Sequence, residues 1–245
     1  MKIAILISGQ PRFNREFNDL LDNLNSTDQL DFFFYLWNSD PSDIHWIPPT
    51  WPKDYNSIRA KIESNLPANS NIADLRVLPQ IDYKVTKTYN LTPWSNPVNI
   101  WYTYYGIKQV NLMREEYEQT FGKYDLVIKA RPDTGIDSAI DFNFIKQYLD
   151  ENPNTVIMPN DRRYGMAGSA VNDLLGIGLP ETMSTYCRAV DSFDQYNDQG
   201  CPYHGETLLA WHLKASGIEA PETNFNCTFR EHWYAHNEPD YGPWL

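Results

Sequence analysis

Two charged side chains directly follow a short apolar run, and their types and spacing suit phosphate or metal chemistry. Residues 126–128 are consecutive and β-branched-rich, which is typical of a strand buried on both faces. Arg131 and Asp133 should then emerge at the carboxyl end of that strand, where open α/β sheets bind ligands. A carboxylate there can hold a divalent cation against a diphosphate, and an arginine can meet phosphate oxygens bidentately. An ion pair that merely closes the strand end is the alternative interpretation.

A second candidate group follows the first apolar run, at residues 2–7. It consists of Ser8, Gly9, Gln10, Pro11 and Arg12. These residues offer backbone amides, a hydroxyl, an amide and a guanidinium at an expected helix start, where anions bind well. The segment matches neither the Walker A loop nor the GxGxxG fingerprint, so a structural turn remains the alternative. If both strands are parallel neighbours, this loop and Arg131 converge on one edge of the sheet.

A third candidate is Glu206, in a segment that reads as a loop entering a helix that ends at Gly217. A glutamate in the first turn of a helix often only complements the helix dipole. The alternative is a general base that faces a sugar hydroxyl.

Other motifs give weaker signals. His232 and His236 are spaced as a helical metal pair, but HExxH is absent, and the neighbouring Trp and Tyr favour a cap over a cleft. No GxSxG motif indicates a nucleophilic serine. Residues 165–169 are rich in glycine and fit either a mobile loop over the site or a plain turn.

Composition restricts the class of protein. A chain of 245 residues with 42% hydrophobic and 14% aromatic residues can bury a large core, and we expect a single domain over 1–245. A net charge of −12 with scattered basic residues argues against a nucleic-acid partner. Three cysteines without CxxC spacing indicate reduced core thiols. Neither a signal peptide nor an apolar stretch long enough to span a membrane is evident, so we expect a cytoplasmic protein.

The order of apolar patterns predicts alternating strands and helices, and hence an α/β sheet rather than a sandwich or a bundle. Strands are expected at 2–7, 30–36, 75–79, 125–130 and 155–158, and residues 173–178 form another short apolar segment. Helices are expected at 13–24, 57–65, 98–121, 142–149, 181–196 and 205–217. The stretches 41–56 and 81–97 read as irregular loops.

The ordered set of motifs resembles small glycosyltransferases of the GT-A fold that occur in bacteria and large-genome viruses. The resemblance covers most of the chain. The segments that carry it are Ser8–Arg12, the strand ending in Trp37 and Asn38, the helix 101–111, the segment 124–133, the segment 173–178, and Gly205, Glu206 and Thr207 before the last helix.

This resemblance implies a GT-A-like, mostly parallel central sheet flanked by helices. It implies transfer of a sugar from a nucleotide-diphosphate-sugar donor to a glycan or another hydroxyl acceptor. The donor would be bound by Ser8, Gly9, Gln10, Arg12, Trp37, Lys108, Arg131 and Asp133.

The resemblance also implies two chemical roles. Asp133 matches the last acidic residue of the family's Asp-x-Asp motif and would bind Mn²⁺ or Mg²⁺. Arg131 stands where the first Asp is expected, which puts the metal in doubt, because the guanidinium could itself neutralise the diphosphate. Glu206 falls where inverting members place the catalytic base.

Two other functions remain open at the sequence level. A nucleotidyltransferase or another nucleotide-sugar enzyme on a similar sheet would normally carry a longer glycine- and lysine-rich first loop. A carbohydrate-binding protein without catalysis would use its Trp and Tyr rings as stacking platforms and would not need Glu206.

Overall fold

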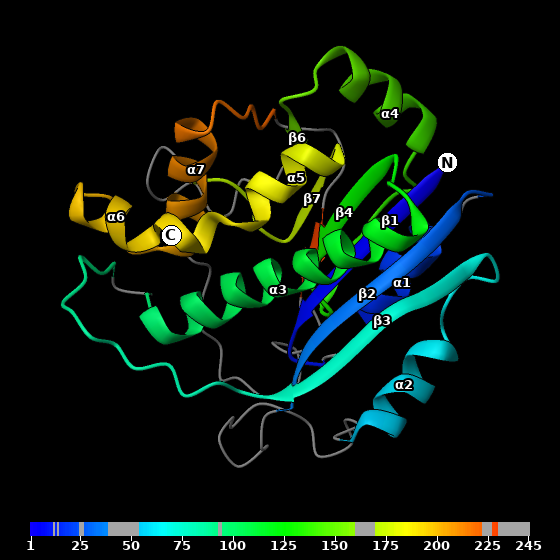
Figure 1. Cartoon of the computed structure of the whole chain (residues 1–245), viewed down its shortest axis with the longest axis horizontal. Coiled ribbons are helices and arrows are strands. Elements are labelled where there is room, and N and C mark those ends of the chain that lie inside the picture. The colour runs from blue at the N-terminus through cyan, green and yellow to red at the C-terminus, as the bar shows by residue number, and fades with distance from the viewer. Residues whose placement is uncertain are drawn as a thin grey trace, which may run out of the picture.

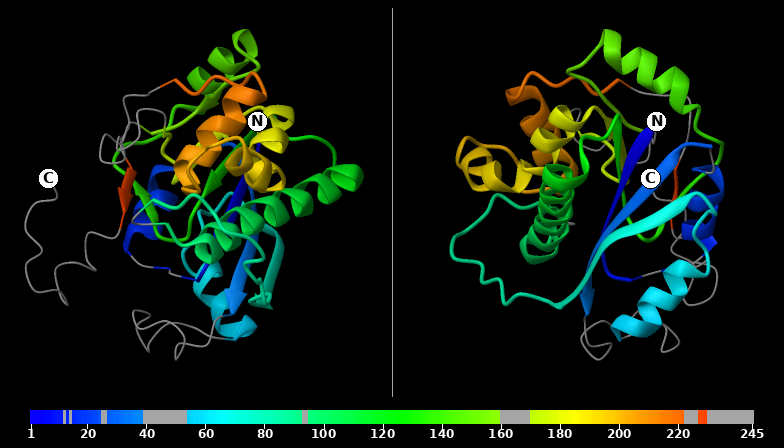
Figure 2. Two further views of the ribbon diagram at one scale, coloured as in Figure 1. Left: turned by 90° about the vertical axis from the view of Figure 1, so that its left-hand side faces the viewer. Right: turned by 45° about the vertical axis from the view of Figure 1, so that its right-hand side comes forward.

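The computed structural model describes residues 1–11, 13, 15–24, 27–38, 54–92, 95–159, 170–221 and 227–229. A central six-stranded sheet lies between two layers of helices (Figures 1 and 2). The expected mixed α/β architecture with a mostly parallel sheet is therefore confirmed.

The strand order in the sheet is β3-β2-β1-β4-β7-β6. The strands are β1 (Lys2–Gly9), β2 (Gln29–Asn38), β3 (Ser70–Pro79), β4 (Leu126–Ala130), β6 (Val156–Ile157) and β7 (Leu175–Gly178). The pairs β2–β3, β1–β2 and β1–β4 are parallel, whereas β7 runs antiparallel to both β4 and β6. The chain builds outward from β1 to β3 and then crosses back to place β4 on the other side of β1. The boundary between β1 and β4 is thus a topological switch point, where α/β sheets bind ligands.

The helices are α1 (Arg15–Asn23), α2 (Tyr55–Glu63), α3 (Pro97–Phe121), α4 (Phe142–Glu151), α5 (Pro180–Cys187), α6 (Phe193–Asp198) and α7 (Gly205–Ala215). The starts of three of them have side-chain caps: Asp54, Asn96 and Asp141 each accept a hydrogen bond from backbone amides of the first turn. The last helix ends as predicted, with Gly217 at a φ of +66° just after it.

Alternation along the strands assigns each side chain to one face of the sheet. Ile3, Ile5 and Ile7 pack under α1, α2 and α4, whereas Ala4 and Leu6 face α3, α5, α6 and α7. Ser8 continues the second series, so its side chain lies on the α3 side. On β4 the same logic places Lys129 on that side with Val127.

Two parts of the fold differ from the sequence prediction. The helix predicted at 181–196 is interrupted, because α5 and α6 are separated by a 3-10 turn, η3 (Ala189–Ser192). Ala189 and Phe193 are both buried, and Phe193 packs edge-on against Tyr104, so the chain bends around α3 instead of continuing straight. A small second sheet, β5 (Thr134–Ile136) paired with β8 (Cys227–Phe229), was not predicted because each strand has only three residues.

Several sequence predictions fall outside the described residues. They concern the proline-rich stretch at 41–53, the glycine-rich stretch at 165–169, and His232 and His236. Cys187 and Cys201 are buried free thiols, as expected. No helix in the described part of the chain is long and apolar enough to cross a bilayer.

Candidate active site at the carboxyl ends of β1 and β4

The two predicted loops meet at the switch point. Gly9 ends β1 with a φ of +134°, and a side-chain Cβ built on it would lie 3.5 Å from the Pro132 ring. Glycine is favoured there because of this backbone angle. The loop after β1 and the loop after β4 are therefore in contact, as the parallel pairing of these strands predicted. Arg12 lies outside the described residues.

Arg131 and Asp133 form a close ion pair. Arg131 donates from Nε to Asp133 Oδ1 at 3.0 Å and from Nη2 to Oδ2 at 3.2 Å. The Asp133 side chain is 3% exposed, and that of Arg131 is 23% exposed. The bidentate geometry fixes the plane of the guanidinium at the edge of the sheet.

This pairing bears on the metal predicted at Asp133. Both carboxylate oxygens already accept hydrogen bonds from a cation, and a divalent ion requires anionic oxygens that face it. Among the described residues, no group of three His, Cys, Asp or Glu side chains is arranged to hold a metal. In this arrangement Asp133 does not fit a metal ligand, and the Mn²⁺ or Mg²⁺ site stays a prediction.

Ser8 and Trp37 lie together beside α3. A Cβ built on Gly106 would be 3.7 Å from Ser8 Oγ and 3.6 Å from Trp37 Nε1. Trp37 is 2% exposed, and its Nε1 is buried without a hydrogen-bond partner. A buried N–H that lacks a partner is energetically costly. The predicted neighbours Ser8 and Trp37 are thus brought together, and Gly106 joins them.

Lys108 forms an ion pair with a residue outside the predicted site. Its Nζ lies 2.6 Å from Asp191 Oδ1 on η3, on the side of α3 that faces the η3 turn. None of its described contacts reaches another predicted site residue. Its proposed role in donor binding therefore has no support from the geometry.

Glu206 lies in the first turn of α7, and its environment differs from that of a solvent-exposed carboxylate. Burial is the largest cause that raises its pKa to about 7, and the negative charge of Asp173 is the next. Arg131 and Lys129 act in the opposite direction and lower it. These influences place Glu206 within electrostatic range of the β4 end. The structure therefore brings the two independently predicted groups, Arg131 with Asp133 and Glu206, to the same edge.

Asp173 and its contacts were not predicted as part of this site. Asp173 precedes β7 and is 7% exposed, and the antiparallel pairing of Leu175 with Ala130 brings it to the carboxyl end of β4. Its Oδ2 accepts a hydrogen bond from Tyr104 Oη at 3.1 Å, and its carbonyl accepts one from Lys129 Nζ.

One sequence signal could have pointed to this neighbourhood. Lys129 is the single charge inside an otherwise apolar strand and is fully buried, and a buried charge requires a partner. His204, which flanks Glu206, adds a further polar group: its Nε2 lies 3.2 Å from Glu206 Oε2, and burial lowers its pKa.

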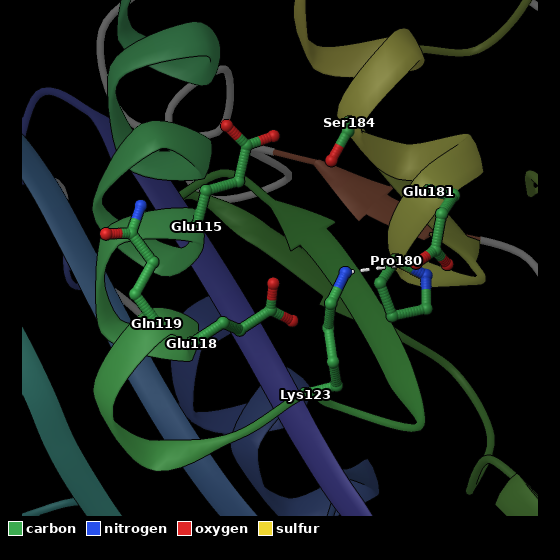
Figure 3. A pocket seen from close by; sticks show the side chains of 7 residues that line it. All are labelled: Glu115, Glu118, Gln119, Lys123, Pro180, Glu181 and Ser184. Atoms are coloured by element: carbon green, nitrogen blue, oxygen red, sulfur yellow. Dashed lines mark hydrogen bonds and ion pairs between the residues drawn. The ribbon is translucent and has the colours of Figure 1, made fainter.

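The pocket drawn in Figure 3 lies elsewhere. It has a volume of about 390 Å³ between the carboxyl-terminal half of α3 and the start of α5. Lys123 and Glu181 form an ion pair of 3.1 Å across it. Because β4 begins just after α3 and β7 ends just before α5, this pocket borders the opposite edge of the sheet from Arg131.

Comparisons with known proteins do not identify the chain. No protein-family model matches it, and a search of curated proteins found no significant relative. The fold and the site define the class only as an α/β protein with a polar, charged site at the switch point of its sheet.

Proposed function

We propose that the protein is a glycosyltransferase that moves a sugar from a nucleotide-diphosphate-sugar donor to a hydroxyl acceptor. One observation carries this proposal: a fixed arginine and a partly buried glutamate with a pKa of about 7 lie at the same edge at the switch point. The arginine can stabilise an anionic leaving group. The glutamate can accept a proton from a hydroxyl near neutral pH. The resemblance of the ordered motifs to small GT-A glycosyltransferases supports the same function.

In the proposed reaction, Glu206 accepts the proton of the acceptor hydroxyl as the hydroxyl oxygen attacks the anomeric carbon of the donor sugar. The bond from that carbon to the diphosphate oxygen breaks, and the diphosphate leaves with the electron pair. Arg131 stabilises the charge that develops on the diphosphate. Attack opposite the leaving group inverts the anomeric configuration.

Asp133 holds Arg131 in place for this role, and Ser8, Gly9, Gln10 and Trp37 are proposed to bind the nucleotide part of the donor.

The test is a thermal-shift panel of UDP, GDP, CMP and dTDP and their sugar conjugates, each with and without Mn²⁺. A ligand that binds only the folded state raises its melting temperature. We expect one nucleotide series to stabilise the wild type and to stabilise an Arg131→Ala variant much less. The control is Arg59→Ala, which removes an exposed arginine on α2. No shift with any nucleotide, together with binding of free oligosaccharides, would instead support the carbohydrate-binding alternative.

A further inference from the structure

Asp173 is held beside the start of α7 by two buried side chains. Tyr104 on α3 is 2% exposed and donates its hydroxyl to Asp173 Oδ2 at 3.1 Å. Lys129 on β4 is fully buried and donates to the Asp173 carbonyl. Because both the carboxylate and the main chain of Asp173 are anchored by different elements, its position is well determined.

The same tyrosine contacts the residue next to Glu206. A Cβ built on Gly205 would lie 3.1 Å from Tyr104 Cε2 and 3.5 Å from its Oη. Only glycine allows this approach without displacing the ring. In addition, Val171 N donates to the Glu206 carbonyl at 3.4 Å. The Tyr104 ring therefore packs on the start of α7 while its hydroxyl holds Asp173.

Charged and titratable groups from several elements surround Glu206. From β4 and the residue after it, Lys129 and Arg131 favour the ionised carboxylate. Asp173, in the segment before β7, disfavours the ionised Glu206 carboxylate, and burial disfavours it more strongly. From α3, Tyr104 lies within electrostatic range, and beside α7 His204 lies 3.2 Å away. If Asp173 lost its charge, Lys129 and Arg131 would act on Glu206 without the opposing charge of Asp173.

We propose that Asp173, anchored by Tyr104, is a positioning residue that makes Glu206 a stronger base. This inference rests on the proposed function. When the acceptor hydroxyl gives its proton to Glu206, the carboxylate becomes neutral and its repulsion by Asp173 disappears. The proton transfer is thereby favoured, and the proton later leaves Glu206 for water.

The direct test is a ¹³C NMR titration of protein labelled at the glutamate side-chain carboxyl carbons. The Glu206 signal is assigned by its loss in Glu206→Gln. In Asp173→Asn, which is isosteric and can still accept from Tyr104, we expect the Glu206 midpoint to fall by about one pH unit or more. Tyr104→Phe, which keeps the ring but frees the Asp173 carboxylate, should give a smaller decrease. An unchanged midpoint in Asp173→Asn would overturn the proposal.

A control variant completes the NMR test, and a kinetic measurement separates this inference from the proposed function. Asp150→Asn removes an exposed carboxylate on α4 and should leave the midpoint unchanged. If the panel identifies a donor, the acidic limb of kcat/KM should move to lower pH in Asp173→Asn, and kcat on the plateau should fall by about tenfold. If the Glu206 midpoint falls in Asp173→Asn but the protein transfers no sugar, the proposed function is overturned. The inferred effect of Asp173 on Glu206 is then still supported.

Discussion

The Glu206 carboxyl couples proton binding to folding, because its pKa is about 7 in the folded protein. In the unfolded chain the same carboxyl has an ordinary pKa near 4.5. Between these values the folded state holds one more proton than the unfolded state, so the free energy of unfolding falls as pH rises. The loss is complete above pH 7 and absent below about pH 4.5, and each pH unit within the window costs about 1.4 kcal/mol.

Glu206→Gln should remove the decrease in the free energy of unfolding that the raised Glu206 pKa causes as pH rises. We expect the variant to be more stable than the wild type at pH 8 by about 3 kcal/mol, and close to it at pH 4.5. Urea denaturation at a series of pH values measures the difference. A constant difference between the two proteins across the series would mean that Glu206 has no raised pKa. Glu63→Gln on α2, where the carboxylate is half exposed, is the matched control.

Asp133 offers a second test at the residue scale, because its geometry favours an arginine anchor over a metal ligand. We expect Asp133→Ala to weaken nucleotide binding by at least about tenfold through loss of the Arg131 orientation. Addition of EDTA should leave the wild-type affinity unchanged in isothermal titration calorimetry. A tenfold loss on chelation, restored by Mn²⁺, would instead make Asp133 part of a metal site.

At the scale of elements, α3 and α5 are joined through one buried arginine. Arg114 is 1% exposed and donates to Glu118 Oε1 at 2.8 Å and to Ser184 Oγ at 2.7 Å. Glu118 is itself buried and also accepts from the Tyr124 amide. A buried charge that loses its partner is strongly destabilising.

We therefore expect Glu118→Ala to lower the free energy of unfolding by about 3 kcal/mol. Glu116→Ala, at an exposed position of the same helix, should cost less than about 1 kcal/mol. Guanidinium denaturation followed by tryptophan fluorescence compares them. Equal effects of the two variants would show that burial of the Arg114 pair contributes nothing to the docking of α5.

The elements that build the switch point were predictable, but one part of the site was not. Strands β1, β2 and β4 are mostly apolar, and Arg131 and Asp133 follow directly from where β4 ends. Asp173 precedes its strand, so it reaches the same edge only because β7 is antiparallel to β4. An apolar pattern carries no information on strand direction. Tyr104 fitted the helical register as a core residue, and nothing in its spacing indicated that its hydroxyl would meet a carboxylate.

For the whole molecule, the charge balance conflicts with the ligand that we propose. The chain carries a net charge of −12, and a nucleotide-diphosphate-sugar is also an anion. The attraction supplied by Arg131 acts over a few ångströms, whereas the repulsion by the remaining surface acts over the Debye length. That length is about 30 Å at 0.01 M ionic strength and about 8 Å at 0.15 M. Salt therefore screens the long-range repulsion before it weakens the contact at the partly buried arginine.

We expect association of the donor nucleotide to become faster as ionic strength rises from about 0.01 to 0.15 M. A protein that binds anions through an extended basic surface shows the reverse dependence. Stopped-flow measurement of the tryptophan signal gives the rate, with sucrose at matched viscosity and osmolarity as the control for non-ionic effects. A rate that falls with salt would place the nucleotide on a basic surface outside the switch point, because Arg131 alone does not outweigh the charge of the whole chain at long range.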